Sequence, residues 1–182
     1  HVECLRQVGA PGNWKAGLID LAPVLAPAVC EFGADIPGAD APHYLPAMAA
    51  DQGVERTLDA TLFVPYTQDA RAHLRPVHFR ADIANVNRCV GTLLGYEVTK
   101  AHPEGLPDGA ITIDCDGSAG QSFGAFLPAG VTLNVRGDAN DYFGKGLSGG
   151  VVSVRPPEGA TFKFDENIIV GNVAFFGATS GR

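Results

Sequence analysis

The chain has 182 residues, a formal net charge of −7, and 46% hydrophobic against 18% charged residues. This apolar content is enough for one buried core, and the absence of clustered Lys and Arg argues against a nucleic-acid partner. Glycine (23 residues) and proline (13 residues) make up nearly a fifth of the chain, which favours many turns and short strands over long helices.

The first 76 residues are predicted to be an irregular linker. Prolines recur at positions 11, 23, 27, 37, 42 and 46, and each removes a backbone donor and restricts φ, so long helices are disfavoured. Trp14 is expected to anchor this linker by apolar burial. One or two short helices are expected around residues 48–50 and 55–62.

A regular pattern begins at residue 77. Residues 77–83 alternate apolar and polar side chains, which predicts a half-buried strand. Apolar residues at helical spacing then predict an amphipathic helix over residues 88–101. Residues 105–109 form a turn, and no helix is expected after it.

From residue 110 the sequence repeats with a period of about twenty. Gly137 echoes Gly117, and Gly150 echoes Gly130. A third copy is offset by about 32 residues, so that residues 180–181 echo residues 148–149. The extra length is assigned to an inserted loop at residues 156–166.

This period predicts a mainly β fold, a right-handed parallel β-helix over residues 77–182 preceded by the linker and a short amphipathic helix. Glycines are expected at corners, where the backbone needs positive φ or a close approach. The last coil, residues 167–182, is expected to expose an unpaired edge that is frayed or covered by another chain. The residues expected to point inward are Ile111, Ile113, Leu133, Val135, Val152, Val154, Ile168 and Val170.

Two motifs suggest chemistry. Residues 144–149 match the G-x-G-x-x-G pattern of dinucleotide sites, with Asp165 about twenty residues further on, but a strand-like segment follows where that site needs a helix. Residues 146–150 match the G-x-S-x-G elbow around Ser148, but no histidine follows His102 to act as a base. In both cases a glycine corner is the favoured interpretation.

No metal or redox motif is evident. Cys4, Cys30, Cys89 and Cys115 are too far apart for a CxxC site, and the histidines form no close ligand pair. Free cysteines and the lack of an export signal favour the cytoplasm, with two bridged pairs of these cysteines as the alternative. Four carboxylates could suggest a cation site, but capping of backbone donors is the favoured role for them; they are Asp138, Asp141, Asp165 and Glu166.

Several segments resemble the large (alpha) subunit of glutamate synthase. Residues 85–100 resemble the helix that leads into its C-terminal domain, and residues 117–128 and 137–150 are similar to the first two glycine-rich coils of that domain. Residues 14–21 resemble the segment that follows its flavin-binding barrel. Because the chain starts at His1, has Met48 as its only methionine and ends within the repeat, we expect it to be a piece of a longer polypeptide.

The resemblance implies a C-terminal GXGXG domain of an enzyme that makes two glutamates from glutamine and 2-oxoglutarate. The family's N-terminal cysteine, FMN barrel and iron–sulfur cysteines have no counterpart in this chain. We therefore expect no catalytic, cofactor-binding or metal-binding residue here, and a scaffold role between the glutaminase and synthase domains. A small FAD-containing subunit or ferredoxin is the implied electron-transfer partner.

Two other classes of function stay open at this point. One is a stand-alone GXGXG interaction subunit of a multi-subunit oxidoreductase, because related glycine repeats occur as separate chains. The other is a hydrolase using Ser148.

Overall fold

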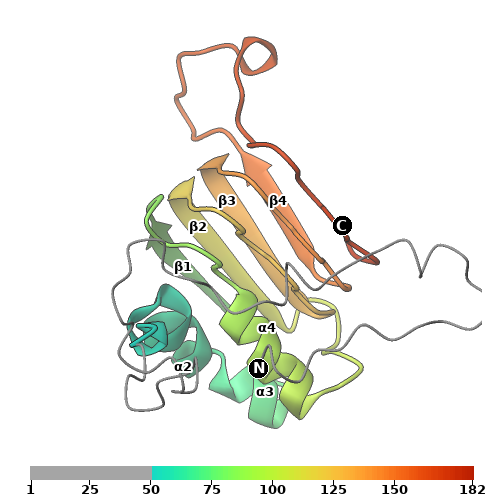
Figure 1. Cartoon of the computed structure of the whole chain (residues 1–182). Coiled ribbons are helices and arrows are strands. Elements are labelled where there is room, and N and C mark those ends of the chain that lie inside the picture. Colours follow the sequence, from blue (N-terminus) through green and yellow to red (C-terminus); the bar gives the residue numbers. More distant parts are fainter. Residues whose placement is uncertain (1–50) are drawn as a thin grey trace, which may run out of the picture. The chain divides into compact units, whose positions relative to one another are not determined.

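The computed structural model describes residues 51–182 (Figure 1). The predictions for Trp14 and for a helix at residues 48–50 lie outside the described residues. Four parallel strands form one sheet in chain order. They are β1 Val77–Ile83, β2 Ile111–Ala119, β3 Val131–Ala139 and β4 Val151–Arg155. The strand predicted at residues 77–83 is confirmed over its whole length.

The pairing register reproduces the repeat that the sequence predicts. Gly117 lies opposite Gly137, and the whole of β2 pairs with β3 at the twenty-residue offset. Ser148 forms a parallel bridge with Ser180, as the 32-residue offset requires. We call residues 111–130, 131–150 and 151–182 the first, second and third repeats.

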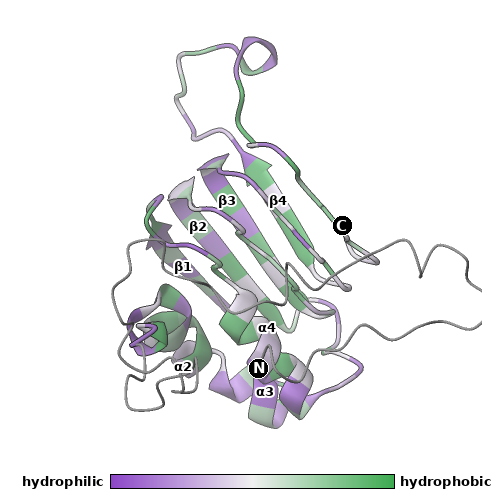
Figure 2. Cartoon of the chain, in the orientation of Figure 1, coloured by the Kyte–Doolittle hydropathy of each residue, from purple (hydrophilic) through white to green (hydrophobic). Residues whose placement is uncertain are grey.

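Buried and more exposed residues alternate along β2 and β3, and apolar and hydrophilic residues alternate along the ribbons of the sheet in Figure 2. Of the predicted inward set, Val154 and Val170 are only partly buried. The prediction is wrong for Ile168, which is 89% exposed. Here the chain returns from the loop after β4, and Val170, not Ile168, is in register with the buried Ala139. The fully buried members are Ile111, Ile113, Leu133 and Val135, with Val152 nearly so.

Helical turns precede β1 and extend further than the predicted 55–62. They are η3 Val54–Arg56, the π-helix η4 Asp59–Phe63, α2 Val64–Tyr66 and α3 Gln68–His73. Phe63 is fully buried and its ring meets Phe79 of β1 edge-on, with centroids 5.8 Å apart. Burial of an aromatic ring against the sheet, which local sequence pattern does not reveal, stabilises this longer helical segment.

The helix α4 spans Thr92–Ala101 and is shorter than the predicted 88–101. Cys89 and Gly91 have positive φ, 54° and 92°, which is incompatible with a right-handed helix before Thr92. Its buried face consists of Leu94, Gly95 and Val98. The helix thus packs against the core, while Cys89 and Gly91, just before it, have the positive φ values expected at a corner.

After β4 the chain leaves the sheet in the predicted loop, which carries one 3-10 turn, η5 Phe164–Glu166. Residues 167–182 then return along the second repeat; Gly171 N donates to Ala139 O, and Thr179 N donates to Leu147 O. This segment is therefore paired on its inner side rather than frayed, and its covering by another chain stays a prediction. Within residues 51–182, no helix has the length and apolar character needed to cross a membrane.

Candidate functional site

The glycine clusters form corners in which every second residue has positive φ. Corresponding positions recur in the three repeats, with φ between 58° and 69°. They are Ser122, Gly124 and Phe126 in the first repeat, Tyr142, Gly144 and Gly146 in the second, and Val173, Phe175 and Gly177 in the third. A G-x-G pattern is thus the natural sequence for such a corner, because glycine adopts this conformation without steric cost.

The backbone donors of the corners bind neighbouring repeats in alternating directions. Gly144 N donates to Phe123 O of the first repeat at 2.8 Å, and Gly146 N donates to Phe176 O of the third at 2.8 Å. These N–H groups are therefore unavailable to a pyrophosphate. The strand β4, not a helix, follows the motif. The dinucleotide interpretation of residues 144–149 fails on both requirements.

Ser148 has no catalytic partner among the described residues. Its Oγ donates to Leu127 O at 3.3 Å. His78 is bound to Asp114, and His102 Nε2 lies 2.7 Å from Arg71 O. A serine nucleophile needs a base within hydrogen-bonding distance. The geometry therefore gives the hydrolase hypothesis no support.

The four candidate carboxylates are dispersed. Asp141 Oδ1 accepts from Asn172 N at 2.7 Å, and so links the second repeat to the third. Glu166 pairs with Lys163 inside the exposed loop. In the part of the chain that the structure describes, no three His, Cys, Asp or Glu side chains come together as metal ligands. Asn140 adds a link to the segment after β1, since its Nδ2 donates to Asn85 Oδ1 at 2.9 Å.

A row of polar side chains runs across the outer face of the sheet. Ser153 Oγ donates to Asn134 Oδ1 at 2.6 Å, and Asn134 Nδ2 donates to Asp114 Oδ1 at 2.9 Å. His78 Nε2 lies 2.9 Å from Asp114 Oδ2 at the other end. The Asn134 hydrogen bond, helped by His78, lowers the pKa of Asp114. One residue from each strand takes part, so the row joins all four strands in one register.

Asp59 is a buried carboxylate that sequence reasoning missed. It is 3% exposed, and its two oxygens accept from the backbone N–H groups of Gly91, Leu93 and Leu94, at 2.8–3.1 Å. Burial raises its pKa, against the lowering effect of these three donors. Asp59 therefore caps α4 from more than thirty residues upstream. A local capping pattern cannot reveal such a long-range contact.

The described cysteines differ in reactivity. Cys115 is fully buried in the core, and burial raises the pKa of its thiol to about 12. It therefore stays protonated and inert at neutral pH. Cys89 is exposed, and neither residue forms a disulfide. Cys4 and Cys30 lie outside the described residues.

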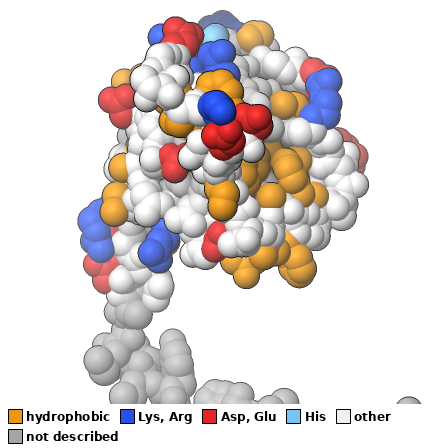
Figure 3. Space-filling view, turned by 90° about the horizontal axis from the view of Figure 1, so that it is seen from above, with side chains coloured by type: hydrophobic (Ala, Val, Ile, Leu, Met, Phe, Trp, Pro, Cys, Tyr) orange, Lys and Arg blue, Asp and Glu red, His pale blue; other side chains and the backbone are white. Residues whose placement is uncertain are grey.

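A groove of about 550 Å³ lies between the carboxyl ends of β2 and β3 and the loop that follows β4. Figure 3 shows apolar side chains exposed among charged ones on the face seen from above. Arg136, on the groove wall, is paired with Asp116, which raises the pKa of the guanidinium; its Nε is buried without a partner. Asp138 also lines the groove. Two carboxylates against one guanidinium disfavour an anionic ligand.

Comparison with known proteins identifies the class to which these corners belong. A family model described as "GXGXG motif" matches residues 60–182. The chain therefore belongs to the GXGXG family.

Glutamate synthases from several organisms are similar to this chain. It is 41% identical over 176 residues to the glutamate synthase [NADPH] large chain of Bacillus subtilis, covering 95% of this chain and 11% of the relative. It is 44% identical over 173 residues to the glutamate synthase [NADH] of Saccharomyces cerevisiae, covering 93% and 8%. The ferredoxin-dependent glutamate synthase of Pyropia yezoensis is 45% identical over 104 residues, or 57% of this chain and 7% of the relative. The resemblance to glutamate synthase is thereby confirmed, and the chain spans about a tenth of its relatives' length.

Proposed function

We propose that residues 77–182 form a right-handed parallel β-helix that serves as a scaffold in a glutamate synthase. The observation that carries this proposal is the use of the backbone donors at the first and second corners for hydrogen bonds to adjacent coils. Backbone groups consumed in this way stabilise stacking and are unavailable to a ligand. The parallel sheet, the equal register of β2 and β3 and the stacked corners are the features that support a solenoid.

In this proposal residues 1–76 connect the β-helix to a preceding flavin-binding barrel. The helical turns of residues 54–73 then cap the open end of the solenoid core, because Phe63 and Ala70 are buried against it. Solenoids need such a cap, since a terminal repeat would otherwise expose apolar side chains to water.

The longer polypeptide would convert glutamine and 2-oxoglutarate into two glutamates in the cytoplasm, with FMN and an iron–sulfur cluster bound outside this chain. The scaffold would hold the glutaminase and synthase domains in register. Relatives named for NADPH, NADH and ferredoxin all match this segment. A segment common to all three suits a role that is independent of the electron donor, whether a small FAD-containing subunit or ferredoxin supplies the electrons.

A chimaera tests the scaffold role. The matching segment of the Bacillus subtilis large chain is replaced by this chain, and glutamine hydrolysis is measured together with glutamate formation. We expect both activities to persist and to stay coupled one to one. With Gly137→Ala in the inserted segment, we expect hydrolysis without matching glutamate formation. Full coupling after replacement by an unstructured linker of equal length would overturn the proposal.

The isolated 182-residue chain tests the expectation that this segment binds no flavin cofactor. After expression with excess FMN and gel filtration, we expect no flavin absorbance to co-elute with the protein. Stoichiometric FMN would show that this segment binds the cofactor itself.

A further inference from the structure

The first strand, β1, has one unpaired edge. Sheet order places β1 outermost, with β2 as its one neighbour among the described strands. Val77 N donates to Ala110 O, so the odd-numbered residues of β1 direct their backbone groups toward β2. His78, Arg80 and Asp82 direct theirs to the opposite side. No described residue bonds to the N–H groups on that side.

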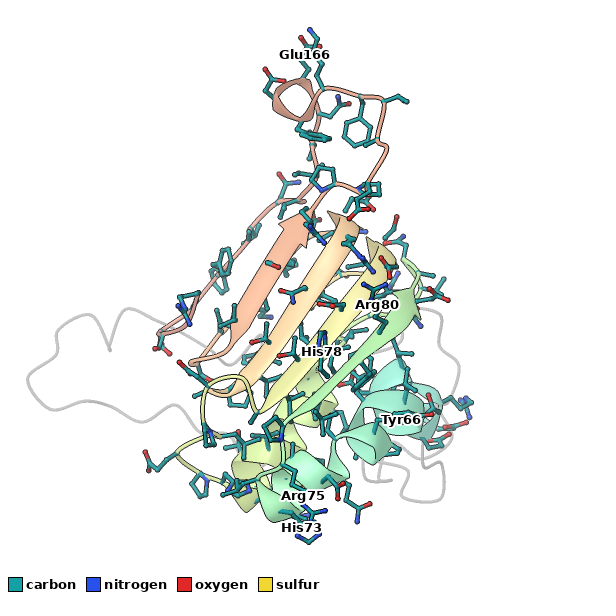
Figure 4. All side chains as sticks on the ribbon, turned by 180° about the vertical axis from the view of Figure 1, so that it is seen from behind. Tyr66, His73, Arg75, His78, Arg80 and Glu166 are labelled. Atoms are coloured by element: carbon teal, nitrogen blue, oxygen red, sulfur yellow. The ribbon has the colours of Figure 1, made fainter. Side chains whose placement is uncertain are left out.

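Basic side chains line this edge. Figure 4 shows His73 and Arg75 near the start of β1 and His78 and Arg80 along it. Between Asp69 and Asp82 the sequence contains no acidic residue, although the whole chain carries a net charge of −7. Within the described residues, Arg75 and Arg80 form no ion pair, while His78 shares Asp114 with Asn134. The edge thus carries two guanidinium groups without an ion-pair partner among the described residues, Arg75 and Arg80, against one carboxylate, Asp82, on a chain of net negative charge.

Exposed apolar side chains also lie close to β1 in space or in sequence. The ring of Tyr66 lies 5.5 Å from that of Phe79 and is 62% exposed. Leu74, just before β1, is 55% exposed. A strand added at this edge would therefore meet charged side chains on its outer face and apolar ones on its inner face.

We propose that the free edge of β1 binds an acidic, amphipathic extended segment of another polypeptide, which adds to the sheet as a further strand. Backbone groups of His78, Arg80 and Asp82 would supply the hydrogen bonds, as in other cases of strand addition. The side chains set a pattern for the partner: acidic residues opposite His78 and Arg80, and a basic residue opposite Asp82. This inference is independent of the scaffold role.

The test uses the 182-residue chain and fluorescent heptapeptides in which valine alternates with three charged positions. One peptide carries glutamate, glutamate and lysine in that order, a second has the reverse order, and controls carry lysine, lysine and glutamate in both orders. Fluorescence anisotropy measures Kd. We expect at least one glutamate-rich peptide to bind more tightly than its charge-swapped control, and binding to weaken as salt is raised. Equal binding of all four peptides, or of none, would overturn the proposal.

Two variants locate the binding. Arg80→Pro removes one donor from the free edge and one charge but no bond to β2, and should weaken binding by about fivefold or more. Arg80→Glu should weaken binding of the glutamate-rich peptide and tighten binding of the lysine-rich one. Arg155→Glu on β4 should change neither Kd. Circular dichroism checks that each variant is folded. If sedimentation shows instead that the free chain dimerises and that Arg80→Pro gives monomers, a second copy occupies the edge and the proposal is wrong.

Discussion

The corners of the first two repeats and of the third repeat have the same positive-φ backbone conformation but are built from different residues. In the first two, glycine occupies the middle position of each corner, at Gly124 and Gly144; in the third, Phe175 holds that position with φ 58°. Val173 likewise has φ 58°, although β-branched residues rarely adopt such values. Positive φ alone therefore does not decide where glycine must stand.

At other positions, the close approach of two backbones decides that glycine is required. A Cβ on Gly137 would lie 1.9 Å from Gly117 O, and a Cβ on Gly117 would lie 2.1 Å from Ile83 O. These glycines stand at the same level of successive strands, where no side chain can be accommodated. The fold therefore requires glycine where two backbones approach closely, whereas the corner positions also accept other residues with some backbone strain.

The largest expected effect is at the stacked glycines. Gly137→Ala should lower the free energy of unfolding by about 4 kcal/mol, because the new methyl overlaps a backbone oxygen and φ is 154°. Gly109→Ala is the control, since φ there is 75° and nothing lies within 4 Å of the added methyl. That control should lose about 1 kcal/mol from the positive φ alone. Equal losses of unfolding free energy in the two variants, measured by urea unfolding, would contradict the view that close backbone approach makes Gly137 irreplaceable.

The next effect concerns the ring stack that links the corners. Phe123 is fully buried, and its ring stacks on Phe143 with centroids 5.9 Å apart. Phe123→Ala should destabilise the chain by about 3 kcal/mol because it leaves a cavity. Phe175→Ala, at a ring 44% exposed, should lose about 1 kcal/mol. A larger loss at Phe175 would mean that the third repeat is as tightly packed as the first two.

Asp59→Ala should lower the free energy of unfolding by about 2 kcal/mol, because the backbone N–H groups of Gly91, Leu93 and Leu94 lose their acceptor. Since burial raises the pKa of Asp59 above 3.8, the folded wild-type chain binds more protons than the unfolded chain between 3.8 and the raised pKa. Wild-type stability should therefore fall relative to the variant as pH rises through that window. Urea unfolding from pH 4 to pH 7 measures this, with Asp165→Ala at an exposed position as the control. A difference in free energy of unfolding between wild type and variant that grows as the pH rises would contradict this expectation.

The smallest effect is a gain in stability. Val173→Gly should raise the free energy of unfolding by about 0.5 kcal/mol, because relief of the left-handed strain slightly exceeds the entropy of the more flexible chain. Val154→Gly, in a regular strand, should instead lose stability. Thermal unfolding of the two variants gives opposite shifts if the corner of the third repeat is strained.

The sequence by itself determined the strand at residues 77–83, the twenty-residue register and the positions of the repeats, because alternation and recurring glycines are local or periodic signals. It also predicted that Gly144 to Gly150 would be a structural corner. Only the tertiary structure showed that α4 begins at Thr92, that Asp59 caps it, and that Ile168 lies outside the core. Each of these depends on a contact between residues far apart in the chain. The same holds for the glycines: their spacing is visible in the sequence, but only the stacked backbones show which of them cannot carry a side chain.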